Sequence, residues 1–224
     1  MRTLHEHRVY ASDYSGGISA RPIYQRALDL VRQQNLTGPL LDFGSGKGQF
    51  IQLLLDTGYP GPIAGADLMA RPPNLPETVY WIQGDLNDPL LLADSSFDLI
   101  TCTEVIAHLE NPRFLFREFH RLLRPGGTVI LTSPNLESLR SYAGLLTGGH
   151  FAAFRGIAYP ALITVLLRTD FTRICAESGF VPPAFSYTGD GLMPKLHLSW
   201  QRLSFGFLKG RLFSDNLALI TRKN

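Results

Sequence analysis

The pattern of apolar residues predicts short strands that alternate with helices between residues 40 and 133. Each predicted strand is a brief run of mostly apolar or β-branched residues, which is typical of a strand that is buried in a sheet. The predicted strands are LLDF at 40–43, PIAGADL at 62–68, TVYWIQGDL at 78–86, SFDLITCTEV at 96–105, TVILTSPN at 128–135 and NLALITRK at 216–223.

Helices are predicted where apolar residues recur at spacings of three and four. These segments are RPIYQRALDLVRQQ at 21–34, QFIQLLLDTG at 49–58, NPRFLFREFHRLLRPGG at 111–127 and RTDFTRICAESGF at 168–180. Pro22 suits the first turn of its helix, and Gly58 and Gly179 suit helix C-terminal ends. The segment at 70–77 is rich in proline, so any helix there must be vestigial.

Alternating strands and helices predict an α/β fold with a mainly parallel sheet. The length of 224 residues fits one domain with a full-sized core. Residues 1–36 are interpreted as a polar arm followed by a helix. The segments 136–168 and 187–215 fit the alternation poorly and are rich in aromatic residues and leucine, so we interpret them as insertions that cap the sheet edge.

Composition excludes several classes of protein. Hydrophobic residues make up 45% of the chain and charged residues 18%, which is typical of a globular protein and not of a disordered one. The net charge of +2 is too weak to indicate a nucleic-acid partner. Cys102 and Cys175 lie in apolar runs and are predicted to be buried free thiols, with no metal site. The absence of a signal-like or membrane-spanning apolar run favours a cytoplasmic protein.

The residues that carry chemistry follow the predicted strands. In an open α/β sheet, ligands bind beyond the carboxyl ends of the strands. The first strand is followed by the loop GSGKG at 44–48, and the next strands end at Asp67, at Asp85, and at Thr103 with Glu104. We therefore expect one glycine loop and several carboxylates to line a common site.

The glycine loop does not match the two commonest phosphate-binding patterns. Lys47 is followed by Gly48, so the P-loop pattern GxxxxGK[ST] is absent. The third glycine comes one residue too early for the dinucleotide pattern GxGxxG, which argues against a nicotinamide oxidoreductase. Taken alone, the loop remains compatible with a simple tight turn between a strand and a helix.

The aspartates after the next two strands favour a nucleoside. A carboxylate at Asp67 can accept hydrogen bonds from both hydroxyls of a ribose, and Asp85 can accept one from the exocyclic amine of a purine. The alternative for each residue is a helix cap or a turn. Three aspartates and a glycine loop, all at strand ends, make the nucleoside site the better interpretation.

Several stretches together resemble the class I S-adenosylmethionine-dependent methyltransferases, in order and spacing from about residue 40 to residue 135. They are LLDFGSGKG, GADL, QGDL, SSFDLITCTEVIAHLENP and LLRPGGTVILTSPN. The closest group is the small-molecule type that includes quinone-biosynthesis O-methyltransferases. The resemblance implies a Rossmann-like three-layer sandwich with a seven-stranded, mostly parallel sheet whose last strand is antiparallel. It also implies that 37–135 is a cofactor-binding core for S-adenosyl-L-methionine.

The resemblance also implies roles for individual residues. It assigns cofactor binding to Arg21, Asp42, Gly44, Gly46, Asp67, Leu68, Asp85, Leu86 and Thr103. In this assignment the glycine loop passes the methionine moiety, Asp67 holds the ribose hydroxyls, and Asp85 with Leu86 reads the adenine. The chain departs from the family at Ala107, where glutamate is very common, and in the loop at Phe43 and Ser45.

Methyl transfer from a sulfonium is a direct displacement, so in-line positioning and exclusion of water supply much of the rate. A general base is needed only if the acceptor must lose a proton. His108, after the fourth predicted strand, is a candidate base; the alternative, favoured by Ala107 beside it, is a structural histidine that bonds a loop carbonyl. His150, in the glycine-rich and aromatic stretch GGHFAAF, is the second candidate.

The expected partner is a small-molecule methyl acceptor, and the expected reaction is O-methylation. The stretch TCTEVIAH lacks the Asn/Asp-Pro-Pro-aromatic motif of nucleic-acid amino-methyltransferases, so no nucleic acid is expected. The segment 195–213 mixes basic and aromatic residues; we favour a helix that covers the sheet edge over a membrane-surface helix, because Gly206 and Gly210 weaken a long helix. The protein is expected to be a monomer or a homodimer. The alternative function is a non-catalytic regulatory module that binds S-adenosylmethionine or S-adenosylhomocysteine.

Overall fold

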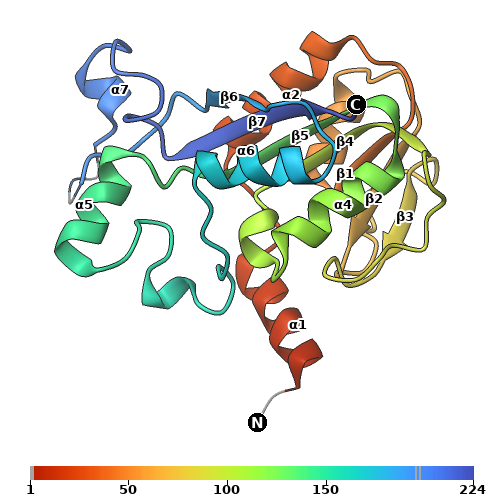
Figure 1. Cartoon of the computed structure of the whole chain (residues 1–224), viewed down its shortest axis with the longest axis horizontal. Helices are drawn as coiled ribbons and strands as arrows, with labels where there is room; N and C mark the ends of the chain where they lie inside the picture. The colour runs from red at the N-terminus through yellow and green to blue at the C-terminus, as the bar shows by residue number, and fades with distance from the viewer. Residues whose placement is uncertain (1–2, 195, 197) are drawn as a thin grey trace.

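The computed structural model describes residues 3–194, 196 and 198–224, and it has an α/β architecture (Figure 1). The strands are β1 (Leu40–Phe43), β2 (Ile63–Asp67), β3 (Tyr80–Gln83), β4 (Phe97–Thr103), β5 (Leu123–Pro134), β6 (Ala184–Tyr187) and β7 (Asn216–Arg222). The helices are α1 (Leu4–Ser15), α2 (Arg21–Gln34), α3 (Gln49–Asp56), α4 (Pro112–Leu122), α5 (Leu139–Gly148), α6 (Arg168–Glu177) and α7 (Trp200–Leu203), with 3-10 turns η1 (Ile106–His108) and η2 (Gly156–Ala158).

The seven strands form one sheet in the order β3-β2-β1-β4-β5-β7-β6. The pairs from β3 to β5 are parallel, whereas β7 is antiparallel to both of its neighbours, β5 and β6. The predicted seven-stranded sheet with an antiparallel last strand is thus confirmed. The direction of strand order reverses between β1 and β4, and this reversal is where open α/β sheets bind their ligands.

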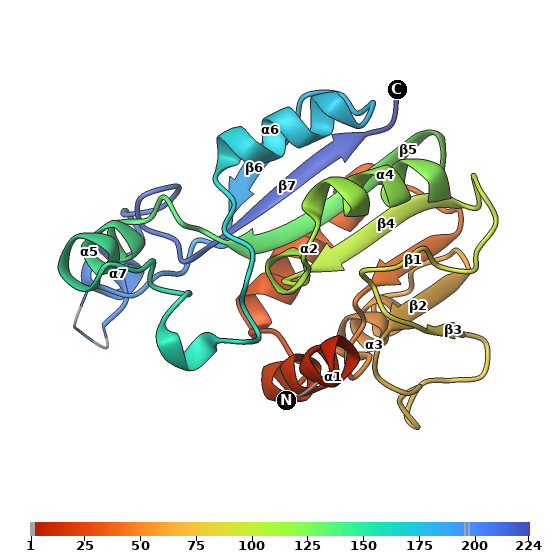
Figure 2. The same ribbon diagram turned by 60° about the horizontal axis from the view of Figure 1, so that its bottom comes forward.

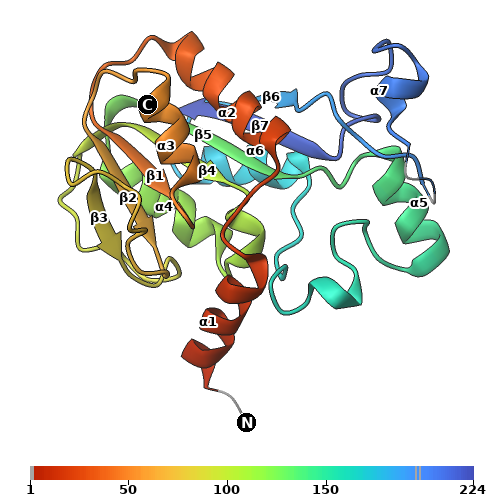
Figure 3. The ribbon, with the colours of Figure 1, turned by 180° about the vertical axis from the view of Figure 1, so that it is seen from behind.

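Two apolar cores hold the helices against the two faces of the sheet. Alternate residues along β1 point to opposite faces, so Leu41 and Phe43 join the core under α4 and α6, whereas Leu40 joins the core under α2 and α3. Figure 1 shows α4 and α6 in front of the sheet, and Figure 3 shows α2 and α3 covering the opposite face. This is the three-layer sandwich that was expected.

Local sequence signals explain where the helices begin and end. The side chain of Asn111 accepts a hydrogen bond from the backbone N–H of Phe114 at 2.9 Å, which caps the start of α4. Pro22 occupies the first turn of α2, and that helix ends at Gln34, followed by the C-cap residue Asn35, whose φ of 51° is left-handed. The predicted helix at 21–34 and the predicted strand at 40–43 have the same bounds in the structure.

Two elements differ from the expectation. The predicted polar arm is helical from Leu4 to Ser15, where it forms α1 with a complete capping box between Thr3 and Glu6. The short strand β6, AFSY at 184–187, was not predicted from the apolar pattern, because half-buried residues on a sheet edge give no long apolar run.

The two insertions, which contain α5 and α7, lie beyond the same end of the sheet (Figures 1 and 2). Leu139 N–H donates to Leu212 O at 2.9 Å, and Arg140 pairs with Asp215 at 2.6 Å. They therefore extend from the carboxyl end of β5 and do not lie along the outer strands β3 and β6.

The favoured helix over 195–213 is wrong, because α7 spans only four residues. The chain turns directly afterwards, with left-handed backbone at Phe205 and Gly206. Phe205 is 93% exposed and Phe207 87%, so these two aromatic side chains do not pack on the sheet. Residues 195 and 197 within it lie outside the described residues. In the described part of the chain, no helix is long and apolar enough to cross a membrane.

Candidate functional site

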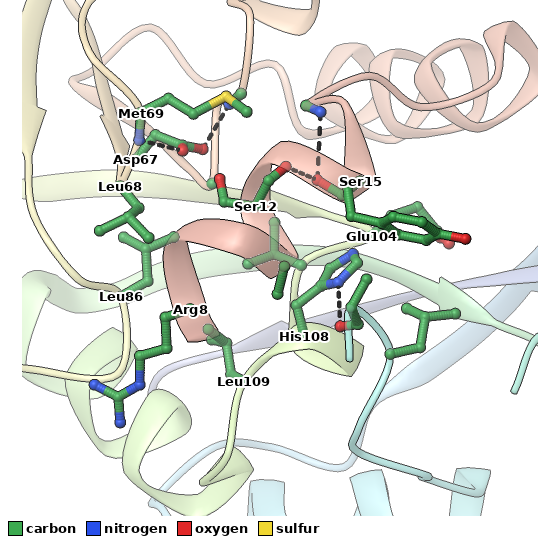
Figure 4. A pocket seen from close by; sticks show the side chains of 18 of the residues that line it. Arg8, Ser12, Ser15, Asp67, Leu68, Met69, Leu86, Glu104, His108 and Leu109 are labelled. Carbon is green, nitrogen blue, oxygen red and sulfur yellow. Dashed lines mark hydrogen bonds between the residues drawn. The ribbon is translucent and has the colours of Figure 1, made fainter. Parts of the chain in front are cut away.

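A cavity of about 580 Å³ lies at the carboxyl ends of β1, β2 and β4. Its floor is the sheet edge with the glycine loop, and its other walls are α1 and the segment 158–163 (Figures 2 and 4). The lining includes every residue that was predicted to bind the cofactor except Arg21. It also includes His108, one of the two predicted bases. The cavity therefore lies where the strand order reverses, and most of the predicted site residues line it.

The glycine loop is shaped by close contacts that leave no room for side chains. Gly44 has a φ of +82°, and a Cβ there would stand 2.1 Å from Val105 Cγ2. Gly46 has a φ of +53°, and its Cβ would stand 2.3 Å from the carbonyl oxygen of Gly17. That same carbonyl accepts a hydrogen bond from Lys47 N at 3.0 Å. The loop thus requires glycine for both backbone conformation and space.

Asp67 joins the end of β2 to the glycine loop. Its Oδ2 accepts a hydrogen bond from Gly46 N at 2.7 Å, and its Oδ1 accepts one from Met69 N at 2.9 Å (Figure 4). Burial raises the pKa of this carboxyl, and the backbone hydrogen bonds oppose that effect. A carboxylate has about four acceptor positions, so the side chain can still accept two hydrogen bonds from a ligand.

Asp42 supports the loop from below. Its side chain is 1% exposed, and Oδ1 accepts a hydrogen bond from Thr101 Oγ1 at 2.8 Å. Its backbone carbonyl accepts a hydrogen bond from Ser45 Oγ at 2.7 Å. Burial raises the pKa of Asp42 to about 7. The residue lines the cavity and also fixes the first turn of the loop.

Asp85 is engaged by the N-terminal helix. Its Oδ2 pairs with Arg8 at 2.7 Å, and its Oδ1 accepts hydrogen bonds from the backbone and side-chain nitrogens of Asn87. Burial acts to raise the pKa of Asp85, but the contacts with Asn87 and Arg8 outweigh it and lower the pKa. Leu68 and Leu86 line the cavity beside it, and Figure 4 shows both near Arg8.

Thr103, the last residue of β4, and Glu104, which follows it, both line the cavity. Glu104 has a φ of +62°, a conformation that is rare for residues other than glycine. Its Oε2 accepts a hydrogen bond from Asn216 Nδ2 at 3.0 Å. Among the described residues, neither Glu104 Oε1 nor Thr103 Oγ1 has a hydrogen-bond partner, although both atoms are buried. Burial raises the pKa of Glu104 to about 7.

His108 stands on η1 at the cavity wall. Its Nδ1 lies 2.6 Å from the carbonyl oxygen of Ala161. A carbonyl can only accept, so Nδ1 carries the proton and the neutral ring keeps a lone pair on Nε2. Burial lowers the pKa of His108, which favours this neutral form at pH 7. The alternative to a catalytic role was a histidine that bonds a loop carbonyl, and that bond is present. It orients Nε2 toward Ser15 (Figure 4).

Arg21 and His150 do not line the cavity. Arg21 is an exposed residue at the start of α2. His150 follows α5, and its Nδ1 lies 3.2 Å from the carbonyl oxygen of Phe151. The structure therefore does not bring either residue to the remaining candidates, and their functional roles stay predictions.

The roof of the cavity was missed by the sequence analysis. One face of α1 lines the cavity with His7, Arg8, Ala11, Ser12 and Ser15. Arg8 holds this helix through Asp85 and Glu110, and the hydroxyl of Tyr14 donates to the carbonyl oxygen of Ile157. The capping signature Thr-x-x-Glu before the helix and Gly16 after it are the signals that could have found it.

Arg8→Ala is expected to lower the free energy of local unfolding of α1. The substitution removes a charge-assisted hydrogen bond to the largely buried Asp85, worth about 1.5–3 kcal/mol. The pair with Glu110, which is 43% exposed, contributes little. Backbone amides of residues 4–15 should exchange about 10- to 100-fold faster with deuterium. Arg113→Ala, which breaks the exposed pair with Glu177, is the control and should leave α1 unchanged. Equal exchange in both variants would contradict this assignment.

Both cysteines are buried free thiols, as expected, and lie in the core under α4 and α6. In the part of the chain that the structure describes, no three His, Cys, Asp or Glu side chains gather as a group that could hold a metal ion.

A family model described as a methyltransferase domain matches residues 18–182 of this chain. The ubiquinone biosynthesis O-methyltransferase of Pseudomonas paraeruginosa is 44% identical over 55 residues, covering 25% of this chain and 23% of that protein. The protein of the same description from Xanthomonas campestris is 26% identical over 160 residues, covering 63% of this chain and 65% of that protein. The chain thus spans less than two thirds of the length of either curated relative.

Among solved structures, a Burkholderia thailandensis enzyme is similar in fold, with a TM-score of 0.63 and 15% sequence identity. The match covers 100% of this chain and 92% of the Burkholderia enzyme. It is described as 1,6-didemethyltoxoflavin-N1-methyltransferase with bound 1,6-didemethyltoxoflavin and S-adenosylhomocysteine.

Proposed function

We propose that this chain, which belongs to the methyltransferase domain family, transfers the methyl group of S-adenosyl-L-methionine to a hydroxyl of a small-molecule acceptor. The family match confirms the resemblance to class I methyltransferases on which the prediction rested. The observation that carries the proposal is a neutral histidine, His108, oriented into the same cavity as the glycine loop and Asp67.

The residues present fit the cofactor. The cavity volume of about 580 Å³ is in the range of small-molecule sites. Asp67 has acceptor capacity left for the ribose hydroxyls, and the glycine loop presents backbone without side chains to the methionine moiety. Leu68 and Leu86 offer apolar surface for the adenine. Asp85 can accept from the adenine amine through the one acceptor position, on Oδ2, that Arg8 and Asn87 leave open.

When bound, the cofactor supplies an electrophilic methyl group on a sulfonium. Residues of α1 and the segment 158–163 cover part of the site, which limits the access of water and strengthens electrostatic interactions inside it. Holding the acceptor oxygen in line with the methyl group converts a bimolecular reaction into an effectively unimolecular one.

His108 would take the proton of the acceptor hydroxyl. The bond from Nδ1–H to Ala161 fixes the tautomer, so Nε2 is the basic atom, as in other histidines oriented by a carbonyl. A hydroxyl is a weak nucleophile until it loses its proton, whereas a neutral amine attacks without prior deprotonation. A correctly held base therefore favours O-methylation over N-methylation.

The lining also supports a neutral, largely apolar acceptor. Leu109, Tyr159, Leu162 and Ile163 form an apolar wall next to His108. Arg8 is the only arginine or lysine among the described residues that line the cavity, and its guanidinium already pairs with Asp85 and Glu110. An anionic acceptor would find no uncommitted cation there, which favours phenols and similar hydroxylated molecules.

The proposal is tested by turnover on matched acceptors. Methyl transfer from S-adenosylmethionine is measured on hydroxylated aromatics, quinol precursors and sugars, each beside an amine analogue of the same skeleton. We expect transfer to a phenolic hydroxyl and at least about tenfold less to the amine, together with calorimetric binding of S-adenosylhomocysteine. Binding without turnover on any acceptor would instead support the regulatory module, and failure to bind would reject both.

A further inference from the structure

The carboxylate of Glu104, directly after β4, has no role in the site as described so far. Glu104 Oε1 is buried at the cavity wall and has no hydrogen-bond partner among the described residues. Leaving a buried carboxylate oxygen unsatisfied is costly, so a ligand donor is the natural partner for it. The question is which part of a bound molecule supplies that donor.

The backbone holds Glu104 in an uncommon conformation that aims its side chain. With φ at +62°, its N–H donates to Thr132 Oγ1 at 3.0 Å and lies 3.2 Å from Thr132 O. Asn216, on the antiparallel strand β7, donates to the other carboxylate oxygen at 3.0 Å. Strain that is sustained by neighbouring strands is typical of functional positions.

Two residues with hydroxyl groups, Thr103 and Tyr24, line the same cavity. We refer to the part of the site formed by Glu104, Thr103 and Tyr24 as the corner. Thr103 is 7% exposed, and its Oγ1 is buried without a partner in the described structure. Tyr24 lines the cavity with its ring stacked on Phe50, and its hydroxyl oxygen accepts a hydrogen bond from Ser19 N at 2.8 Å. The hydroxyl proton of Tyr24 can therefore be donated into the cavity, and burial raises its pKa, so that it stays protonated.

The corner lies at the opposite end of the site from the ribose position. Figure 4 shows Asp67 and Glu104 on opposite sides of the pocket, with His108 on the side of Glu104. A cofactor with its ribose at Asp67 and its sulfur near His108 would run along the glycine loop toward Glu104. Its far end is an α-amino acid, which carries one ammonium and one carboxylate.

We propose that Glu104 accepts a hydrogen bond from the ammonium group of the cofactor and that Tyr24, with Thr103, donates to its carboxylate. This inference rests on the proposed function, because it assumes that S-adenosylmethionine binds here. The corner supplies one anion and two hydroxyl donors, which match the two charged groups of an α-amino acid.

The test measures, by calorimetry and without turnover, how tightly wild type and Glu104→Gln each bind two ligands. The ligands are S-adenosylhomocysteine and its analogue in which hydrogen replaces the amino group. Wild type should bind the analogue about 10- to 100-fold more weakly, since a charge-assisted hydrogen bond is lost. The Glu104→Gln protein should bind S-adenosylhomocysteine more weakly than wild type by a similar factor. It should bind S-adenosylhomocysteine and the analogue with equal affinity.

Matched controls separate the possible outcomes. Asp98→Asn removes the same charge from the other end of β4, where Asp98 pairs with Arg124, and should leave both affinities within about twofold. Methylthioadenosine, which lacks the whole amino-acid part, should bind Glu104→Gln and wild type equally. Should Glu104→Gln fail to fold, Tyr24→Phe should weaken S-adenosylhomocysteine about tenfold and leave methylthioadenosine unchanged.

Three results would overturn the proposal. A Glu104→Gln protein that keeps wild-type affinity for S-adenosylhomocysteine but has a higher KM for the acceptor would place the carboxylate at the acceptor. Equal weakening of S-adenosylhomocysteine and methylthioadenosine would make Glu104 a structural residue. Wild type that distinguishes the amino-bearing ligand from its analogue by less than twofold would exclude the ammonium contact. Wild type that binds none of these nucleosides would reject the proposed function itself.

Discussion

His108→Asn is expected to lower kcat for a hydroxyl acceptor by about 10²- to 10⁴-fold, the usual contribution of general base catalysis. Asparagine is the matched replacement, because its amide nitrogen can still donate to the carbonyl of Ala161 while the basic Nε2 is gone. The affinity for S-adenosylhomocysteine, measured by calorimetry, should stay within about twofold. An unchanged kcat would remove His108 from proton transfer and leave positioning as its role.

The pH dependence of kcat provides a second readout of the same residue. Burial lowers the pKa of His108 below its ordinary value, and the base must be neutral to act. At saturating cofactor and acceptor, kcat should therefore rise with pH through an inflection below about 6.5 and be flat above it. Saturation matters, because Asp42 and Glu104 have pKa values of about 7 and would add their own titration to kcat/KM. His108→Asn should lose the inflection.

Asp67→Ala is expected to weaken S-adenosylhomocysteine binding by about 100-fold or more. The substitution removes the acceptor proposed for the ribose hydroxyls, and each hydrogen bond to a charged group contributes about 1.5–3 kcal/mol. It also leaves the N–H of Gly46 without its acceptor in the buried loop, at a cost of about 1–3 kcal/mol in the free energy of unfolding. Calorimetry and urea unfolding measure the two effects separately.

The control for this experiment is Asp56→Ala, an exposed carboxylate at the end of α3. It should change neither the affinity nor the free energy of unfolding by more than about 0.5 kcal/mol. Asp85→Ala is an informative companion, since Arg8 already neutralises that carboxylate and the loss of affinity should be smaller than at Asp67. A wild-type affinity in Asp67→Ala would contradict the assignment of the ribose position.

The central sheet was predictable because its signals are local and strong. The strand LLDF and the helix at 21–34 have clean apolar patterns, and the order of motifs along the chain indicated both the topology and the positions of Asp42, Asp67 and Asp85 at one edge. These residues lie together because parallel strands end at the same edge of the sheet.

The cover of the site could not be predicted in the same way. The helix α1 buries little apolar surface, because it lies over a cavity instead of a core, so its apolar periodicity is weak and only its capping residues mark it. The contacts between Arg8 and Asp85 and between His108 and Ala161 join residues far apart in the sequence. Such pairings depend on tertiary geometry, and no local pattern records them.

The contact between Gly17 and the glycine loop determines where the N-terminal helix can pivot. Gly17 is fixed, because its carbonyl bonds to Lys47 N and its Cα lies against Gly46. Gly16 has a φ of +71° and no heavy atom within 4 Å of the position of a Cβ, so it can rotate without a clash. Entry and exit of ligands beneath α1 would thus hinge on Gly16, while the loop that cradles the ligand stays in place.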